Sequence, residues 1–293
     1  MENLLEVKNL QFSFRTYGGV VKAVRDVSFE VRPGEILGIV GESGCGKSVT
    51  SQCLMRLNPE PPGFFEGGEI LYKGKDVLKM NKKELRQFRG KEISYIFQDP
   101  MTSLNPTMRI GKQIEEVFVG RKGMSAAEKK AKALEILKMV GISDGERRYK
   151  QYPHELSGGM KQRVAIAGVV AMEPKCIVFD EPTAMLDPNG RKEVIATAHD
   201  LNKKKGVTII LITHYMEEVV DADYVYVMEK GKIVMDGTPR DIFSRVDELK
   251  EHRLDVPQAT LVADELRSAG VPIPQGILTR KELVDAIMSV ANA

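Results

Sequence analysis

The sequence predicts an α/β fold with a mainly parallel sheet, an N-terminal antiparallel β subdomain and a helical subdomain inserted between two core strands. Three runs, EILGIV, CIVFD and VTIILIT, are almost continuously apolar, which is typical of parallel strands buried on both faces. The earlier β-like runs alternate apolar and polar residues between glycines and prolines, which favours antiparallel pairing. From about Thr107 to Ala171 the pattern is helical only.

The helices predict how the chain is organised. Ser125 and Glu128 form a capping-box pattern at the start of one helix, within a helical subdomain at about 105–172. After about Arg245 a tail begins with two short amphipathic helices, the second opened by Thr279 and Glu282. We therefore predict a main domain at 1–244 and a C-terminal helical extension at 245–293.

The composition is that of an ordinary globular protein. Of 293 residues, 42% are hydrophobic and 29% are charged, and the net charge of +2 argues against nucleic acid as a partner. We find neither an apolar run of the roughly 20 residues that span a membrane nor a signal-peptide pattern. Cys45, Cys53 and Cys176 lack metal-like spacing and indicate thiols in a reducing compartment. We expect a cytoplasmic protein.

The stretch GESGCGKS follows a predicted buried strand and precedes a predicted helix. It fits the pattern G-x-x-x-x-G-K-[ST], so the core is predicted to be a P-loop NTPase. Glycines let successive backbone N–H groups point inward, and the helix N-terminus adds partial positive charge. Lys47 is expected to reach the β- and γ-phosphates, and Ser48 to ligate Mg²⁺. The predicted nucleotide-binding loop comprises Gly41, Glu42, Ser43, Gly44, Cys45, Gly46, Lys47, Ser48 and Val49.

Polar residues at the ends of three other predicted strands complete the expected chemistry. Asp180 ends CIVFD, where ligands of open α/β sheets bind, and is predicted to hold the metal. Glu181 follows as the candidate general base. His214 follows VTIILIT and is predicted to contact the γ-phosphate. Gln98 ends EISYIFQ, and its amide is expected to coordinate either Mg²⁺ or the attacking water.

A second glycine-rich helix start lies in HELSGGMKQR. Ser157 is the natural N-cap, with Gly158 and Gly159 following. Such a terminus suits an anion, although a plain glycine-rich cap explains the pattern equally well.

LSGGM, Gln98, DEPTAMLD and His214, together with the phosphate loop, resemble the nucleotide-binding domain of ABC-type ATPases over about residues 3–243. The resemblance implies hydrolysis of ATP with Mg²⁺, at the interface of two such domains arranged head to tail. Ser157, Gly158 and Gly159 would contact the γ-phosphate bound by the partner chain, and Asp187 would lie at the dimer seam.

The resemblance further implies an adenine-stacking residue and two kinds of partner. Tyr17 is expected to stack on adenine, with Phe14 or a shift of one position as the alternative. Signature loops of this family often read LSGGQ, and Met160 departs from that pattern as importer relatives do. The partners would be a second ATPase chain, identical or paralogous, and an integral membrane permease, which places the protein on the inner face of the cell membrane.

The two halves of the chain resemble different importer ATPases. ESGCGKSVTSQCLMRL, YKGKDVLKM and YPHELSGGM resemble ATPases of oligopeptide, dipeptide and nickel importers. CIVFDEPTAMLDPNGRKEV and the tail LDVPQATLVADELRSAGVPIP resemble ATPases of energy-coupling factor transporters. We predict a recombinant, natural or engineered, joined within about residues 150–175. A natural sequence intermediate between the two groups is the alternative, and the solute is left open among peptide, metal ion and vitamin.

Three other functions compete with transport. The main alternative is a soluble, non-transport ABC ATPase, although the segment between Lys47 and Asp180 leaves no room for the long coiled coil of repair types. A non-catalytic nucleotide-binding regulator would not need the complete set of Lys47, Asp180, Glu181 and His214. A small-molecule kinase would not need LSGGM. Co-purification with a membrane subunit would distinguish transport from all three.

Overall fold

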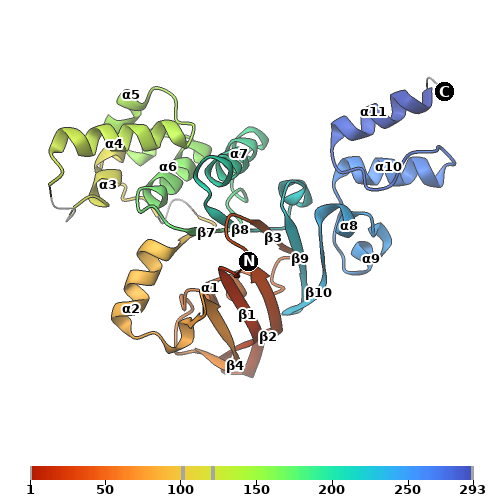
Figure 1. Cartoon of the computed structure of the whole chain (residues 1–293), viewed down its shortest axis with the longest axis horizontal. Helices are drawn as coiled ribbons and strands as arrows, with labels where there is room; N and C mark the ends of the chain where they lie inside the picture. The colour runs from red at the N-terminus through yellow and green to blue at the C-terminus, as the bar shows by residue number, and fades with distance from the viewer. Residues whose placement is uncertain (1, 100–102, 120–122, 292–293) are drawn as a thin grey trace. The chain divides into compact units, whose positions relative to one another are not determined.

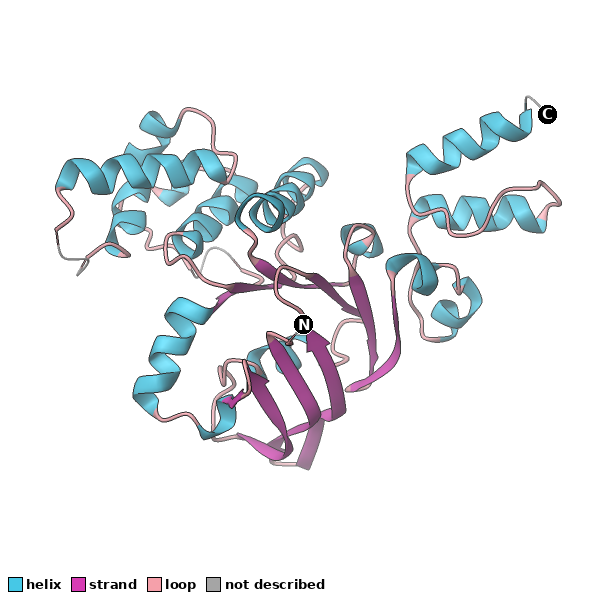
Figure 2. Ribbon diagram, viewed as in Figure 1, coloured by secondary structure: helices cyan, strands magenta, loops and turns pink. Residues whose placement is uncertain are grey.

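The computed structural model describes residues 2–99, 103–119 and 123–291, and it is an α/β structure as predicted (Figures 1 and 2). It divides into two compact units. Unit 1 comprises Met1–Lys79 and Leu211–Ala293, and unit 2 comprises Met80–Ile210. Strand β8 (Thr208–Thr213) contributes residues to both.

Unit 1 contains the predicted antiparallel β subdomain. Its sheet has the order β2-β1-β4-β5, and every neighbouring pair is antiparallel. The aromatic core of this sheet centres on Phe12, whose ring packs edge-on against Phe14 and Phe65 at centroid distances of 5.2 and 4.8 Å. The strands are β1 (Leu5–Thr16), β2 (Gly19–Val31), β4 (Gly63–Tyr72) and β5 (Lys75–Asp76).

A second group of strands in unit 1 carries the phosphate loop. All six residues of β3 (Ile36–Gly41) are buried, and β3 runs parallel to β9 (Tyr224–Glu229). β10 (Lys232–Gly237) pairs with β9 in the antiparallel sense. The short helix α1 (Lys47–Cys53) begins directly after the loop that follows β3.

The C-terminal part of unit 1 is helical, as predicted. The Thr279 hydroxyl accepts from the Glu282 N–H at 3.2 Å, and the Glu282 carboxylate accepts from the Thr279 N–H at 3.1 Å. This confirms the predicted capping pair. The helices are α8 (Pro239–Phe243), α9 (Val246–Glu251), α10 (Gln258–Ser268) and α11 (Arg280–Ala291).

Unit 2 combines a parallel strand pair with helices. β6 (Ile93–Ile96) runs parallel to β7 (Cys176–Asp180), and every residue of both strands is buried. Between them, the described residues form helices and loops without a strand (Figure 2), which confirms the predicted helical stretch. The helices of unit 2 are α2 (Lys82–Gln87), α3 (Ile110–Glu116), α4 (Ala126–Met139), α5 (Gly145–Lys150), α6 (Gly158–Val170) and α7 (Pro188–Lys205).

Local capping signals set two of these helix starts. Ser125 and Glu128 form the predicted capping box of α4, with bonds of 3.2 and 2.7 Å. Ser157 caps α6 by accepting from the Met160 N–H at 3.4 Å. The domain boundaries at about residues 105, 172 and 244 stay predictions, because the two units group residues by contact alone. Searched over the described residues, no helix has the length and apolar character needed to cross a membrane.

Candidate active site

The loop between β3 and α1 has a backbone that only glycine fits. Gly46 has φ 106°, and a Cβ at this position would lie 2.5 Å from the Ala23 carbonyl oxygen. A Cβ at Gly41 would lie 2.3 Å from the Met228 carbonyl oxygen. Both glycines of the sequence pattern are therefore required, because neighbouring strands approach the loop too closely for any side chain.

Neighbouring turns hold this loop in shape. The Cys45 carbonyl accepts from the Gly231 N–H at 2.7 Å, and the Gly231 carbonyl accepts from the Arg25 N–H at 2.7 Å. The Cys45 side chain is 7% exposed, and burial raises the pKa of its thiol. The loop is thus fixed by backbone bonds, and Cys45 packs as a neutral thiol.

The side chain of Lys47 folds back into its own loop. Its ammonium group donates to the carbonyl oxygens of Gly41 at 2.7 Å and Glu42 at 3.0 Å, and the residue is only 3% exposed. Gly46, the N-cap of α1, makes no side-chain capping bond to the first turn. A buried cation beside a helix start without a side-chain cap suits an anion, and phosphate oxygens are stronger acceptors than carbonyls.

The other predicted loop residues surround this lysine. Glu42, Ser43 and Gly44 are exposed, and Ser48 is half-buried at the start of α1. The Val49 carbonyl accepts from the Asn58 side chain at 3.0 Å. The loop therefore presents one open edge, formed by its glycine-rich residues, while its helical side is tied down.

In unit 2, Asp180 ends β7 with one carboxylate oxygen already held. The Tyr95 hydroxyl on β6 donates to Asp180 Oδ2 at 2.7 Å, and both residues are buried. Tyr95 did not figure in the sequence analysis. The signal that identifies it is strand register, because Tyr95 pairs with Val178, and Asp180 lies two residues further along the same face.

Glu181 and Gln98 lie together in unit 2, although they are far apart in sequence. The Gln98 amide donates to Glu181 Oε2 at 3.3 Å. Glu181 has φ 44°, a left-handed conformation that is uncommon for a non-glycine residue and is concentrated at functional sites. The candidate general base is thus aimed by both its backbone conformation and an amide donor.

The remaining predicted residues occupy three separate positions. His214 directly follows β8, in unit 1, with its ring 4.0 Å from the ring of Tyr215. Tyr17, also in unit 1, is fully exposed at the turn between β1 and β2. The predicted dimer residues Ser157 and Asp187 belong to unit 2.

The starts of α6 and α7 lie side by side in unit 2. A Cβ at Gly159 would lie 3.2 Å from the Gly190 Cα, so glycine permits this close approach. Asp187 caps α7 by accepting from the Gly190 N–H at 3.3 Å. Ser157, Gly158 and Asp187 are exposed. Ser157, Gly158 and the predicted seam residue Asp187 therefore form one exposed surface, whereas the third signature residue, Gly159, is buried.

The donor set fits a magnesium ion that arrives with a nucleotide. In the ranges that the structure describes, no group of three His, Cys, Asp or Glu side chains is arranged to hold a metal. Ser48, Gln98 and Asp180 offer the hydroxyl, amide and carboxylate oxygens that Mg²⁺ accepts, and Mg²⁺ commonly combines one or two carboxylates with substrate phosphates. Ser48 belongs to unit 1 and Gln98 and Asp180 to unit 2, and each has the donor chemistry that Mg²⁺ accepts.

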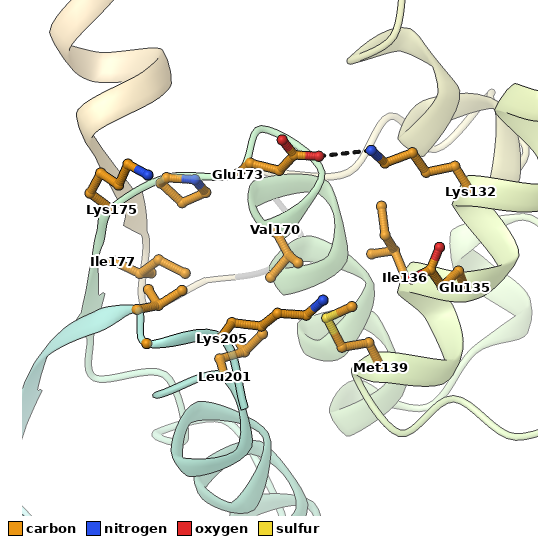
Figure 3. A pocket seen from close by; sticks show the side chains of 13 residues that line it. Lys132, Glu135, Ile136, Met139, Val170, Glu173, Lys175, Ile177, Leu201 and Lys205 are labelled. Atoms are coloured by element: carbon orange, nitrogen blue, oxygen red, sulfur yellow. Dashed lines mark hydrogen bonds and ion pairs between the residues drawn. The ribbon is translucent and has the colours of Figure 1, made fainter. Parts of the chain in front are cut away.

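A cavity of about 420 Å³ elsewhere in unit 2 contains none of the predicted site residues (Figure 3). Ile136 and Leu201 contribute to its apolar lining, and Lys132 pairs with Glu173 at 2.8 Å beside it. Its size alone does not make it the active site, because the phosphate-binding loop and the acids of β7 lie outside it.

Comparisons with known proteins agree with this chemistry. Residues 24–184 match the family described as ABC transporter. The oligopeptide transport ATP-binding protein OppD of Bacillus subtilis (strain 168) is 53% identical over 241 residues, which cover 82% of this chain and 67% of OppD. The energy-coupling factor transporter ATP-binding protein EcfA1 of Clostridium novyi (strain NT) is 44% identical over 291 residues, 98% of each chain.

Solved structures show the same fold. CbiO1 from Clostridium perfringens, part of the ABC transporter complex cbiONQ, is 28% identical with a TM-score of 0.71, and the match covers 90% of this chain and 100% of CbiO1. The ATP-binding cassette MJ0796, in a dimeric post-hydrolysis state bound to ADP and Pi, is 26% identical with a TM-score of 0.71, and the match covers 80% of this chain and 98% of MJ0796. The predicted P-loop NTPase core is confirmed.

Proposed function

The chain belongs to the ABC transporter family of ATPases, and we propose that it is the ATP-hydrolysing subunit of an importer for a small solute. The observation that carries the proposal is the loop from Gly41 to Ser48, which holds a buried lysine beside a helix start. The reaction is ATP + H₂O → ADP + phosphate.

The phosphate loop binds the nucleotide through its own backbone and Lys47. The ammonium group exchanges the carbonyl oxygens of Gly41 and Glu42 for β- and γ-phosphate oxygens, which are stronger acceptors because they carry charge. Ser48, Asp180 and Gln98 would hold Mg²⁺. When bound, Mg²⁺ offsets the negative charge on the β- and γ-phosphate oxygens. Tyr17 would stack on adenine, and its full exposure leaves its ring available.

Hydrolysis then depends on side chains that position one water molecule. Glu181 orients this water or accepts its proton, and the Gln98 amide bound to Glu181 Oε2 fixes the direction of the carboxylate. Tyr95 holds one oxygen of Asp180 in place, and the Asp180 carboxylate would ligate the metal. His214 would donate to the γ-phosphate. Positioning and electrostatics account for most of the catalysis in this class of reaction.

A second ATPase chain, identical or paralogous, would complete each site. Ser157, Gly158 and Asp187 are exposed on one surface at the starts of α6 and α7, and Met185 beside them is 71% exposed. Two exposed helix starts that suit an anion would receive the phosphates of a nucleotide bound to the second chain. The dimeric state in which MJ0796 was solved supports the proposal.

The C-terminal tail offers a further surface for pairing. α10 and α11 pack on each other through a small core that includes Ala263, Ile277 and Leu283. The opposite side of α11 leaves Val284 and Met288 49% and 54% exposed. We assign this side to contact with the second ATPase chain, as the resemblance to energy-coupling factor ATPases suggests. The alternative is that the tail serves only its own unit.

The membrane permease is proposed to dock in a groove of unit 2. A cavity of about 620 Å³ lies between the end of β6 and helices α3 and α6. Phe97 is 44% exposed there, with Val117 and Val169 also in the lining. Apolar residues around a groove of this size suit an amphipathic helix. The permease selects the solute, which is proposed to be a peptide, a metal ion or a vitamin.

We retain the proposal that the two halves of the chain have different ancestry. The more identical relative, OppD, aligns over 241 residues, whereas EcfA1 aligns over 98% of the chain. Identity to each relative, measured in successive windows, is expected to cross over within about residues 150–175. A flat identity profile to either relative would leave a natural intermediate as the explanation.

The proposed function is tested by membrane purification combined with a phosphate-release assay. The tagged chain is expected to co-purify with an integral membrane subunit from detergent-solubilised membranes and to release phosphate from Mg-ATP. Phosphate release without any membrane subunit would support the soluble ABC ATPase instead. A chain that binds a membrane subunit but releases no phosphate would contradict the catalytic part of the proposal.

A further inference from the structure

Residues 82–91 concentrate positive charge in a chain that is otherwise close to neutral. The whole chain has a net charge of +2. This segment alone contains one acid, Glu84, and five cations, which are Lys82, Lys83, Arg86, Arg89 and Lys91. The rest of the chain is therefore acidic on balance, and the small net charge conceals a strongly basic patch.

The structure turns this segment into an exposed surface with one anchor. α2, labelled in Figure 1, continues into a π-helical turn at Phe88–Glu92. Phe88 in this turn is 3% exposed, so burial of its ring anchors the segment. Lys82, Lys83 and Arg86 are exposed. The carboxylate of Glu84 accepts from the Asn81 N–H at 2.9 Å in a capping box, so this acid has a structural role, and the next acid, Glu92, ends the π-helical turn.

Part of this surface is hollowed. An open hollow of about 320 Å³ is lined by Lys82, Leu85, Arg86, Arg89 and Gly90, and we call these residues the basic hollow. No acidic side chain lines it. Among the residues whose structure is described, neither Lys82 nor Arg86 forms an ion pair. Lys82 and Arg86 are like charges on neighbouring turns of α2, and their repulsion would be relieved by an anion from outside.

The shape of the patch indicates which anion fits. Lys82 and Lys91 are nine residues apart, and the α-helical part alone, Lys82–Gln87, spans about 8 Å at 1.5 Å per residue before the π-helical turn that carries Lys91. One small anion cannot reach across this distance, whereas neighbouring headgroups of a lipid surface can. The hollow has no aromatic side chain on which a nucleic-acid base would stack. Leu85, which also lines the hollow, offers apolar contact of the kind that interfacial helices make with membranes.

We propose that the basic hollow and its flanking cations bind the anionic phospholipid headgroups of a membrane surface. This inference rests on the proposed function, which brings the chain to a membrane through a permease. Each lysine or arginine at an anionic surface contributes about fivefold to binding, so the five cations add substantial affinity that declines as salt rises. The contact would orient unit 2 at the membrane without any spanning segment.

Vesicle sedimentation with the full-length chain tests the proposal. The protein is mixed with vesicles of phosphatidylglycerol and phosphatidylcholine, or of phosphatidylcholine alone, at low and high salt. We expect binding to the anionic vesicles only, and about 25-fold weaker binding for Lys82→Gln/Arg86→Gln, because two cations are removed. The control Lys192→Gln/Lys250→Gln removes two exposed lysines outside the patch and should leave binding unchanged.

Further conditions of the same experiment identify which molecule supplies the anion. Inorganic phosphate at the lipid-phosphate concentration should not displace the vesicles, and displacement would point to a free phosphate site and overturn the lipid assignment. Equal loss in the two double variants would also overturn it. Absence of vesicle binding, with co-purification of the permease lost in Lys82→Gln/Arg86→Gln, would assign the patch to an acidic segment of the permease. Phosphate release without lipid should be the same in both variants, so failure of the proposed ATPase is recognised separately.

Discussion

The phosphate loop of unit 1 and the acidic strand end of unit 2 hold their charged groups by different means. Lys47 donates to backbone carbonyls only six and five residues earlier in its own loop. Asp180 and Glu181 are held by side chains 85 and 83 positions earlier, those of Tyr95 and Gln98. One half of the chemistry is therefore built from local backbone, and the other from distant side chains.

This difference predicts how each region responds to mutation. In the loop, the lysine donates to backbone carbonyls that no substitution removes, so the lysine itself and the glycines are the sensitive positions. At the strand end, each acid depends on a partner side chain that can be deleted by itself. Substitutions in unit 2 should therefore separate catalysis, metal binding and stability, whereas those in the loop should affect binding as a whole.

The largest expected effect tests the role of Glu181 as the water-directing group. Glu181→Gln keeps the side-chain length and an oxygen acceptor for Gln98 but removes the base. Turnover should fall by about 10²–10⁴-fold, the usual contribution of general-base catalysis. Phosphate release and equilibrium ATP binding are measured on the same preparation. Loss of ATP binding, or turnover within a few-fold of the wild-type value, would contradict the assignment.

Next in size is the expected loss of affinity in Lys47→Ala. Removing a charge-assisted donor costs about 1.5–3 kcal/mol, or about 10–150-fold in the dissociation constant for Mg-ATP. Calorimetric titration measures the affinity. Lys230→Ala, which removes an exposed lysine of the same unit, serves as the control and should bind normally. An unchanged affinity for Mg-ATP in Lys47→Ala would contradict the assignment of this loop to the nucleotide site.

Tyr95→Phe tests the side-chain contact that distinguishes unit 2. The hydroxyl lost is a buried donor to a carboxylate at 2.7 Å, so the free energy of unfolding should fall by about 1.5–3 kcal/mol. Urea denaturation measures it. Tyr226→Phe is the matched control, because its hydroxyl accepts a long bond of 3.5 Å from the Glu30 N–H. Equal losses of unfolding free energy in the two variants would show that the Tyr95 hydrogen bond stabilises the fold no more than the long Tyr226 bond does.

The same distinction explains how much could be predicted from sequence. The phosphate loop, the capping boxes and the helix starts follow from residues within a few positions of one another, and the structure confirms the loop and the caps of α4 and α6. The buried strands follow from their apolar runs. These features are determined by local backbone chemistry and burial, for which a short stretch of sequence is sufficient.

The side-chain contacts of Asp180 and Glu181 could not be predicted from the sequence and were found only in the folded structure. Tyr95 reaches Asp180 only because β6 and β7 are parallel neighbours in one particular register, and nothing near either residue in sequence specifies that register. The left-handed conformation of Glu181 and the contact between Gly159 and Gly190 are likewise set by tertiary packing. The basic hollow could not be predicted for a further reason. The net charge sums the charges of the whole chain and does not show where on the surface the positive ones gather.

The smallest expected effect concerns Glu282 in unit 1, outside both regions of the site, which is held by the distant Arg240 side chain and by nearby backbone N–H groups. Partial burial alone would raise the pKa of this carboxyl group, but the Arg240 guanidinium and the backbone N–H groups of Leu278 and Thr279 outweigh it and lower the pKa to about 2. A carboxyl group whose pKa is lower in the folded state stabilises the fold above its unfolded pKa, near 4.5, and this stability is lost as the pH falls towards 2.

Because the Glu282 side chain is 37% exposed, solvent screening reduces the expected contribution to about 1 kcal/mol. Unfolding free energies of wild type and Glu282→Gln should therefore differ by that amount at pH 7 and converge between pH values of about 4.5 and 2. Urea denaturation across this range measures the convergence. If the charge of Glu282 stabilises unit 1 through Arg240, the difference in unfolding free energy between wild type and Glu282→Gln will vanish in acid. A difference that persists at low pH would instead assign the role of Glu282 to packing of the cap, independent of its charge.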